Sequence, residues 1–172
     1  MTTAPAFRFS ATINGRQVAL NIPGDRLVID LLRLDLGMTG TKESCGIGVC
    51  GACSILVDGQ LMSACLLLAA RVDGRTITTI EGLAGDGPIS TVQDAFVRNG
   101  GFQCGFCTPG QAIAAVALLA ENPDPTEPDI REWMSGNLCR CTGYRGIVDA
   151  VLAAAQRGDA ESQRPPEQTL HP

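Results

Sequence analysis

Residues 43–53 read ESCGIGVCGAC, and their cysteines Cys45, Cys50 and Cys53 have the spacing C-x4-C-x2-C. Cys65 follows a short way along the chain and completes a first quartet. The other four of the 8 cysteines form a C-x2-C pair and a distant C-x-C pair, and this second quartet consists of Cys104, Cys107, Cys139 and Cys141. A chain of 172 residues can form one ordinary domain or two small ones. The two quartets predict two small domains, each organised around its own centre.

The first quartet has the ligand spacing of plant-type 2Fe–2S ferredoxins, in which four thiolates hold a cluster under a loop. Gly46, Gly48 and Gly51 would let this loop curl closely and point its backbone N–H groups at the sulfurs. The alternatives are a structural zinc site, which usually has two short C-x2–4-C pairs, or a group of buried free cysteines. The same glycines spell the dinucleotide fingerprint G-x-G-x-x-G, but no clear strand and helix frame them as that motif requires. The spacing therefore favours an iron–sulfur cluster.

The second quartet is predicted to come from two segments between helices. Cys107 directly precedes Thr108, which is the expected N-cap of a helix over 109–120, with Gln111 completing a capping box. The positive end of that helix would favour a thiolate and an anionic cluster at Cys107. The spacing alone leaves a four-cysteine zinc site open. A Rieske centre is excluded, because it needs two histidines and the chain has only His171.

The pattern of the first half predicts a small α+β unit. Two hairpins are expected around the turn dipeptides Asn14-Gly15 and Asp58-Gly59, with strands over 7–13, 16–22, 54–57 and 61–65. Apolar residues at helical spacing predict a helix over 27–37, and a last strand is expected over 75–80. The glycines and the proline of 81–88 mark the end of this unit, so the first domain is predicted over 1–82.

The second half is predicted to be an all-helical domain over 83–157. Four short helices over 90–98, 109–120, 126–134 and 144–156 suggest a four-helix bundle with the second quartet at one end. A partner is predicted to cover apolar side chains that so small a bundle cannot hide, chiefly Ala112, Ile113, Val116 and Leu119. Residues 158–172 contain three prolines and few apolar side chains, which predicts a disordered tail.

The composition argues against several classes of function. A formal net charge of −5 disfavours nucleic-acid binding, which requires a basic surface. The N-terminus lacks the basic start and apolar core of a signal peptide, and the longest apolar stretches, 64–70 and 112–120, are far shorter than a membrane span. A cytoplasmic location is therefore expected, and in that reducing compartment the cysteines are better explained as metal ligands than as disulfides. No combination of acid, base and nucleophile suggests a catalytic site.

Three long motifs carry a family resemblance: residues 42–53, 103–110 and 136–144, which read KESCGIGVCGAC, QCGFCTPG and GNLCRCTGY. Together they closely resemble the iron–sulfur subunit of the molybdenum hydroxylases, the family of xanthine dehydrogenase, aldehyde oxidase and carbon monoxide dehydrogenase. The likeness covers about residues 6–157. It implies an N-terminal β-grasp ferredoxin-like domain followed by an all-α four-helix-bundle domain, with a 2Fe–2S cluster at each quartet.

The resemblance also implies partners and an electron path. A large subunit would hold the molybdopterin-type molybdenum cofactor and the substrate, and a medium subunit would hold FAD, in a heterotrimer or a dimer of heterotrimers. Electrons would pass from the molybdenum site through the second quartet's cluster and then the first quartet's cluster to FAD. Gln103 and Cys141 match the positions that approach the pterin, and Cys141 is a cluster ligand as well. Gly46 and Ile47 match the loop that faces the flavin.

Alternatives to this function remain open from the sequence. A free-standing two-cluster ferredoxin would be stable and monodisperse alone, and a zinc-stabilised adaptor module would be colourless. The alternative for Gln103 is a helix-end side chain that bonds to its own turn. The expected apolar surface and the matches at Gln103 and Cys141 favour an electron-transfer subunit, with the substrate determined in the large subunit.

Overall fold

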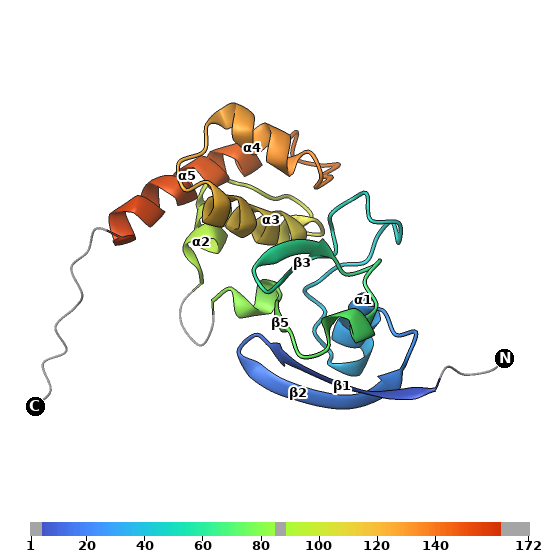
Figure 1. The fold of residues 1–172 in the computed structure, drawn as a ribbon. Coiled ribbons are helices and arrows are strands. Elements are labelled where there is room, and N and C mark those ends of the chain that lie inside the picture. Colours follow the sequence, from blue (N-terminus) through green and yellow to red (C-terminus); the bar gives the residue numbers. More distant parts are fainter. Residues whose placement is uncertain (1–4, 85–88, 163–172) are drawn as a thin grey trace, which may run out of the picture.

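The computed structural model describes residues 5–84 and 89–162, with side chains described up to residue 157. Within these ranges the chain forms a first half that contains a sheet and a second half that is helical, and the two halves lie against each other (Figure 1). This order of elements agrees with the predicted α+β class. None of the described helices is long and apolar enough to cross a membrane.

The first half is built on a five-stranded mixed sheet with the order β2-β1-β5-β3-β4. Its strands are β1 (Ala6–Ile13), β2 (Arg16–Pro23), β3 (Ser54–Val57), β4 (Gln60–Ser63) and β5 (Thr76–Thr78). β1 and β5 are parallel and the other pairs are antiparallel. Both predicted hairpin turns are present. Asn14 and Asp58 each have a φ of 49°, the left-handed conformation that Asn-Gly and Asp-Gly turns require.

A short helical segment packs its apolar face on this sheet. It begins as α1 (Val28–Asp30) and continues as the π-helical turn η1 (Leu31–Asp35), so the helix predicted over 27–37 is shorter and not uniform. Fully buried side chains of this segment and of β1 form much of the core: Phe9, Ile13, Ile29, Leu31 and Leu32. Burial of each such side chain stabilises the fold by about 1.5–3 kcal/mol.

Two strands of the first half end earlier than predicted. β4 stops at Ser63, so Cys65 lies in the turn after the strand. The strand predicted over 75–80 is reduced to β5, because the backbone N–H of Thr79 donates to the side-chain Oδ1 of Asn14 at 2.9 Å instead of continuing the ladder. Two 3-10 turns occupy the segments beside β5: η2 (Ala69–Val72) and η3 (Ile80–Gly82).

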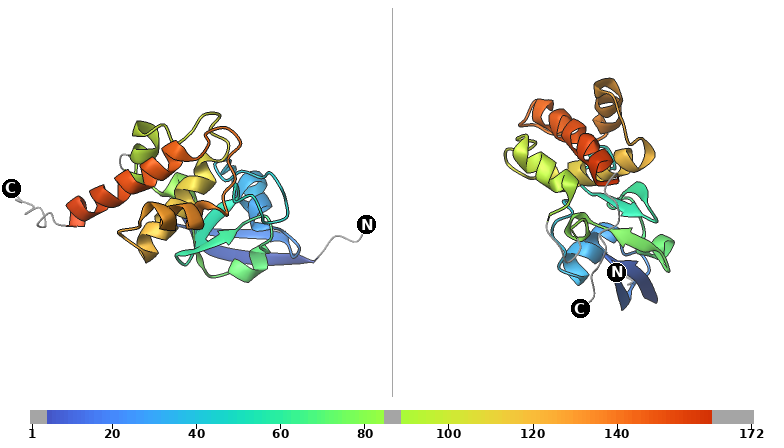
Figure 2. Two further views of the ribbon diagram at one scale, coloured as in Figure 1. Left: turned by 90° about the horizontal axis from the view of Figure 1, so that it is seen from above. Right: turned by 90° about the vertical axis from the view of Figure 1, so that its left-hand side faces the viewer.

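The four helices predicted for the second half are present: α2 (Thr91–Arg98), α3 (Thr108–Glu121), α4 (Glu127–Met134) and α5 (Arg145–Ser162). α5 runs beside α2 along the helical half (Figure 2). The indole N–H of Trp133 donates to the Ala114 carbonyl at 2.9 Å and ties α4 to α3. The core of this half is formed by buried side chains from all four helices, including Phe96, Ala115, Ile130, Met134, Ile147 and Val151.

The last helix corrects the predicted disordered tail. α5 continues through Gly158 to Ser162, whereas the helix was predicted to end at residue 156 and the tail to begin at 158. The prediction is therefore wrong for 158–162, and residues 163–172 lie outside the described part of the chain. A single glycine costs a helix only about 1 kcal/mol, which is too little to end one that already packs along its length.

The helix caps also differ from the prediction. Cys107 is the N-cap of α3 and has a helical backbone conformation, so Thr108 is already the first helical residue and no capping box forms there. The amide of Gln111 instead faces inward, and its side chain is fully buried. The capping boxes occur at α2, between Ser90 and Gln93, and at α4, where Thr126 is the N-cap. Each contributes on the order of 1 kcal/mol.

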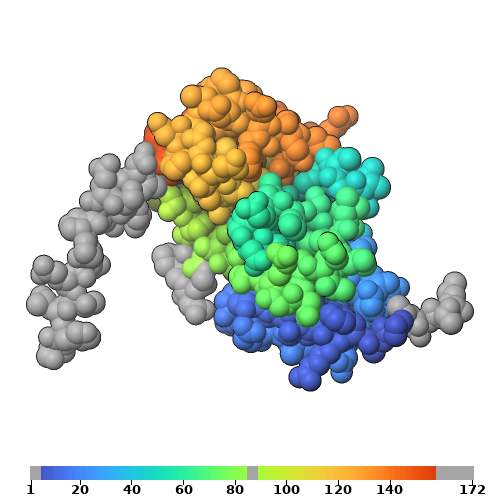
Figure 3. Space-filling model, in the orientation of Figure 1, coloured from blue at the N-terminus to red at the C-terminus, as the bar shows by residue number. Residues whose placement is uncertain are grey.

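The apolar face of α3 is covered within the chain itself. Ala112 and Ile113 are 1% and 0% exposed, because Ala112 lies in the core of the helical half and Ile113 packs with Ala117 against Leu56 of β3. The segment with α3 and α4 lies directly on the segment with β3 and β4 (Figure 3). The prediction that a partner must cover this face is therefore wrong for Ala112 and Ile113. The exposed large apolar side chains near the cysteines are others, namely Ile47, Val49, Leu66, Phe102, Phe106 and Leu138.

Candidate metal centres

The first quartet lies where the glycine-rich loop meets the sheet. Cys53 immediately precedes β3 and Cys65 follows β4, and they are only 3% and 4% exposed. Cys45 and Cys50 come from the loop and are half-buried. The thiols contact each other in two pairs, Cys45 with Cys50 and Cys53 with Cys65. The scaffold therefore holds one pair inside the protein and the other near the surface.

Backbone N–H groups of the loop point at the Cys45 sulfur. Hydrogen bonds lower the pKa of the Cys45 thiol to about 6. The amide of Ile47 contributes most to this shift, and the Cys50 thiol and the amides of Cys50 and Val49 contribute the rest. The loop can curl in this way because three of its glycines adopt left-handed φ angles without strain: Gly46 (66°), Gly48 (76°) and Gly51 (67°). The close curl predicted for this loop is confirmed.

Cys53 of the inner pair shows the opposite shift from Cys45. Burial raises the pKa of the Cys53 thiol to about 11; the Cys65 amide opposes this effect and the Cys65 thiol adds to it. A metal bound there must therefore displace the Cys53 proton, because only the thiolate is a ligand.

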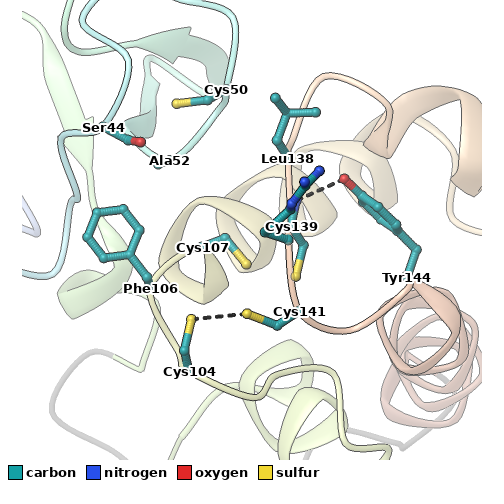
Figure 4. A pocket seen from close by; sticks show the side chains of 11 residues that line it. Ser44, Cys50, Ala52, Cys104, Phe106, Cys107, Leu138, Cys139, Cys141 and Tyr144 are labelled. Carbon is teal, nitrogen blue, oxygen red and sulfur yellow. Dashed lines mark hydrogen bonds between the residues drawn. The ribbon is translucent and has the colours of Figure 1, made fainter.

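The second quartet is assembled from the two inter-helix segments that were predicted. Cys104 and Cys107 precede α3, and Cys139 and Cys141 lie between α4 and α5 (Figure 4). The Sγ atoms of Cys104 and Cys141 are 3.6 Å apart, and the thiols of Cys107 and Cys139 also contact each other. All four line one cavity of about 530 Å³, which Phe106, Leu138 and Arg140 also border. Cys104 and Cys141 are exposed, so this quartet opens to the surface.

The thiols of the second quartet differ in their proton affinity. Burial raises the pKa of the Cys107 thiol to about 12 and thus outweighs the expected effect of the α3 N-terminus. Burial also acts on Cys139, but the Thr142 hydroxyl and the amides of Cys141 and Thr142 together lower its pKa below the ordinary value. The contact with Cys104 raises the pKa of Cys141.

The arrangement of each quartet fits a 2Fe–2S cluster. Such a cluster takes two thiolates on each of its two irons, and the thiols of both quartets stand in two pairs. Soft thiolate donors with N–H or O–H groups directed at sulfur are the surroundings that these clusters use. Among the described residues, no three acidic, thiol or imidazole side chains gather tightly enough to surround a single metal ion.

A backbone hydrogen bond joins the two quartets directly. The N–H of Leu138 donates to the Cys50 carbonyl at 2.9 Å, and Leu138 is the residue before Cys139. One cysteine of the first quartet is thus linked to one cysteine of the second through peptide groups and a single hydrogen bond. Cys50 also borders the cavity of the second quartet.

Buried polar groups support this junction. The Asn137 amide donates to the Gly51 carbonyl at 3.0 Å and reaches the Ser54 hydroxyl at 3.4 Å. The Gln111 amide donates to the Asn137 carbonyl at 2.8 Å. Gly110 has no room for a side chain, because a Cβ there would lie 2.1 Å from the Gly51 carbonyl oxygen. These contacts therefore hold the two halves closely together beside the cysteines.

The structure places the predicted cofactor-facing residues at the surface. Gln103 is exposed next to Cys104. Cys141 is exposed too, and with Cys104 it lines the cavity of the second quartet. Gly46 is exposed in the first loop, and the Ile47 side chain is 66% exposed. These positions are open to a partner, and their contacts stay a prediction.

Sequence reasoning missed the residues that support the cysteines. Gln111 was assigned to a cap, and Asn137, Thr142 and Tyr144 were seen only as parts of a motif. Their side chains act between segments or within an irregular turn, so neither periodicity nor cap spacing could reveal them. The long motif that contains three of them was the one available signal.

Comparisons with known proteins agree with this geometry. Residues 11–78 match the family described as a 2Fe-2S iron-sulfur cluster binding domain, and residues 79–152 match the family described as a [2Fe-2S] binding domain. The two matches together span nearly all of the described chain and place one quartet in each. The chain thus carries two 2Fe–2S binding domains.

Individual relatives extend the match to whole subunits. The chain is 52% identical to a probable xanthine dehydrogenase subunit of Bacillus subtilis over 82% of this chain and 81% of that protein. It is 48% identical to the nicotine 6-hydroxylase small subunit of Paenarthrobacter nicotinovorans over 89% of this chain and 93% of the relative. A solved structure of quinoline 2-oxidoreductase from Pseudomonas putida 86 superposes with a TM-score of 0.86 at 46% identity and covers 90% of this chain and 97% of that chain. The chain belongs to the family of iron–sulfur subunits of the molybdenum hydroxylases.

Proposed function

We propose that this chain is the electron-transfer subunit of a molybdenum hydroxylase and that each of its quartets holds one 2Fe–2S cluster. The first half is then a β-grasp ferredoxin-like domain and the second half a four-helix-bundle domain. When bound, each cluster takes up and releases one electron at a time. The ligands are the eight cysteines, Cys45, Cys50, Cys53 and Cys65 for one cluster and Cys104, Cys107, Cys139 and Cys141 for the other.

The hydrogen bond from the Leu138 N–H to the Cys50 carbonyl carries this proposal. It places the peptide group beside Cys139 against the peptide group of a first-quartet cysteine, 2.9 Å from donor to acceptor. Two independent structural metal sites have no need for such contact. Two electron carriers do need it, because electron transfer between them requires a short path.

The exposed residues of each quartet indicate where partners approach. Cys104, Cys141 and Gln103 form an open face, which we assign to a large subunit with the molybdenum–pterin cofactor. Gly46 and Ile47 form the open face of the first loop, which we assign to a medium subunit with FAD. We propose a heterotrimer, or a dimer of heterotrimers, in the cytoplasm. This chain then has no catalytic side chains of its own.

Metal analysis tests the cluster assignment. The purified chain is expected to contain about four irons and four sulfides, two of each for every 2Fe–2S cluster, and no stoichiometric zinc. Reduction should produce two distinguishable paramagnetic signals, because the two quartets differ in exposure and in hydrogen bonding. One zinc per quartet, or a single signal that accounts for only one spin, would contradict the proposal.

Rapid-mixing absorbance with substrate and no external acceptor tests the direction of flow in the complete complex. Gln103→Ala is expected to slow electron arrival at the clusters while both stay assembled, since glutamine is not a ligand. Gly46→Ala is expected to slow the later transfer to flavin, and Ile47→Ala repeats that test without a change in backbone preference. Gln60→Ala, on the exposed end of β4, is the control. Slowed cluster reduction in the Gly46 variant but not in the Gln103 variant would reverse the assignment.

A further inference from the structure

Three hydrogen bonds form a closed ring around the second segment of the second quartet. The N–H of Cys139 donates to the Tyr144 hydroxyl oxygen at 2.8 Å (Figure 4). The N–H of Tyr144 donates to the Thr142 hydroxyl oxygen at 3.2 Å. The Thr142 hydroxyl in turn donates to the Cys139 sulfur at 3.1 Å. The ring therefore begins and ends on one cysteine.

The turn that carries these three hydrogen bonds contains one residue with a strained backbone. Tyr144 has a φ of 68°, in the left-handed region that bulky residues rarely adopt. Such a conformation costs free energy and persists where surrounding contacts determine it. The Tyr144 carbonyl also accepts the Val148 N–H at 3.0 Å, which opens α5. The start of α5, the strained residue and the ring thus fix one another.

The ring determines where the Thr142 proton points. A hydroxyl carries one proton and can accept through its lone pairs. Because the Tyr144 N–H already occupies an acceptor position of the Thr142 oxygen, the hydroxyl proton is free to point at the Cys139 sulfur. Tyr144 therefore makes two contacts in the ring. Its phenol oxygen accepts from the Cys139 N–H, and its own backbone N–H donates to the Thr142 hydroxyl.

The Cys139 sulfur is approached by the backbone amides of Cys141 and Thr142 as well as by the Thr142 hydroxyl, whereas no side-chain hydroxyl of the described residues acts on Cys45 of the first quartet. The Cys45 sulfur is approached by the backbone amides of Ile47, Val49 and Cys50. Those donors are part of the chain and persist when side chains change. The donor from Thr142 is a side-chain group that a single substitution removes.

We infer that Thr142 is a positioning residue that sets the reduction potential of the second quartet's cluster, with Tyr144 holding its hydroxyl in place. The inference rests on the proposed function, because it requires Cys139 to be a cluster ligand. Reduction adds one electron and makes the ligand sulfurs more negative, so a hydroxyl hydrogen bond stabilises the reduced state more than the oxidised state. Thr142 therefore raises the reduction potential and makes this cluster a better electron acceptor.

The test compares two substitutions of one side chain in the assembled complex. Thr142→Val keeps the branched shape and removes the hydroxyl, whereas Thr142→Ser keeps the hydroxyl. The potentials of both clusters are measured by titration with dithionite, followed by paramagnetic resonance, and iron is counted in each protein. Thr142→Val is expected to reduce the equilibrium constant for reduction of the second cluster by up to about tenfold, a downward shift of about 59 mV for one electron. The first cluster is expected to keep its potential.

Thr142→Ser is expected to remain near the unmodified protein. Tyr144→Phe retains the backbone N–H that donates to Thr142 and loses only the phenol hydroxyl. A smaller downward shift of the second cluster's reduction potential is therefore expected. An unchanged second potential in Thr142→Val, or an equal shift in Thr142→Ser, would overturn the inference. Loss of the second cluster in Thr142→Val alone would also overturn it, because the hydroxyl would then serve assembly. The iron content of the unmodified protein reports separately on the proposed function.

Discussion

In the first quartet the inner pair, Cys53 and Cys65, belongs to the core of the sheet-containing half, whereas in the second quartet Cys104 and Cys141 are exposed at the molecular surface. The hydrogen-bond donors differ in parallel. Backbone amides surround the Cys45 sulfur, whereas the Cys139 sulfur of the second quartet has a side-chain hydroxyl in addition to backbone amides. The first site is thus determined by the course of the backbone, and the second can be adjusted by single side chains.

This difference has a functional meaning in an electron-transfer chain. A site built from backbone donors keeps those donors when the side chains of the loop are replaced. A site that opens to the surface and takes a donor from a side chain can be adapted to the partner that it faces. The hydrogen bond between Leu138 and Cys50 then connects an adjustable site with a constant one.

The largest expected effect separates the two centres completely. Cys139→Ser replaces a soft thiolate with a poor ligand, so the iron content should fall from about four to about two per chain. The signal of the first centre should persist. The matched variant Cys53→Ser should remove the other two irons and leave the second signal. If either variant lost all four irons, the two centres would be one cooperative unit and the comparison would fail.

Gly110→Ala tests whether the halves depend on their close contact. The added methyl would collide with the Gly51 carbonyl oxygen at 2.1 Å. Overpacking of this kind costs up to about 3 kcal/mol, which exceeds the gain of about 1 kcal/mol in helix propensity, so a net loss of about 2 kcal/mol is expected. Denaturant unfolding of the full chain measures it. Gly136→Ala is the control, since no atom lies within 4 Å of its added Cβ.

Asn137→Ala should have a somewhat smaller effect at the same junction. It removes the donor to the Gly51 carbonyl and the contact with Ser54, while the Gly51 carbonyl keeps its bonds from the N–H and hydroxyl of Ser54. We expect a loss of about 1 kcal/mol in the free energy of unfolding, the net value of one buried hydrogen bond, and slower transfer between the centres in rapid mixing. Asn21→Ala, on the exposed face of β2, should change neither quantity. Equal losses in the two variants would show that Asn137 does not join the halves.

The smallest expected effects come from one carboxylate near the surface of each half. The Thr76 amide and Arg75 hold the pKa of Asp58 below its ordinary value of 3.8, and Arg98 and Arg157 do the same for Asp94. A lowered folded-state pKa stabilises the protein above that ordinary value and is lost as the pH falls through the lowered value. Asp58→Asn and Asp94→Asn should therefore each flatten the decline of the melting temperature below about pH 4.

Both shifts should be modest, because Asp58 is exposed and Asp94 is partly exposed, so that solvent screens their ion pairs. Gln60→Ala, on the exposed end of β4, replaces a side chain that does not titrate and is the control, which should leave the acid decline unchanged. A clear flattening in only one of the two variants would show that the halves unfold in acid as separate units.

The parts of the fold that depend on neighbouring residues were predictable. The Asn14-Gly15 and Asp58-Gly59 turns and the number of helices follow from turn chemistry and hydrophobic spacing. The cap at Thr108 was wrong because Cys107 adopts a helical conformation that the pattern does not reveal. The end of α5 was wrong because a lone glycine does not outweigh a helix that is already packed.

The sequence by itself determined which cysteines form each quartet, the left-handed glycines of the first loop and the family, because ligand spacing and turn residues act over short distances along the chain. Only the tertiary structure decided how the quartets meet. The Asn137 side chain reaches Gly51 across 86 positions, and α3 hides its apolar face on β3. It also decided the ring of Cys139, Thr142 and Tyr144, since a strained turn forms only when its surroundings compensate its cost. Such contacts depend on packing between distant segments, and local pattern carries no record of that packing.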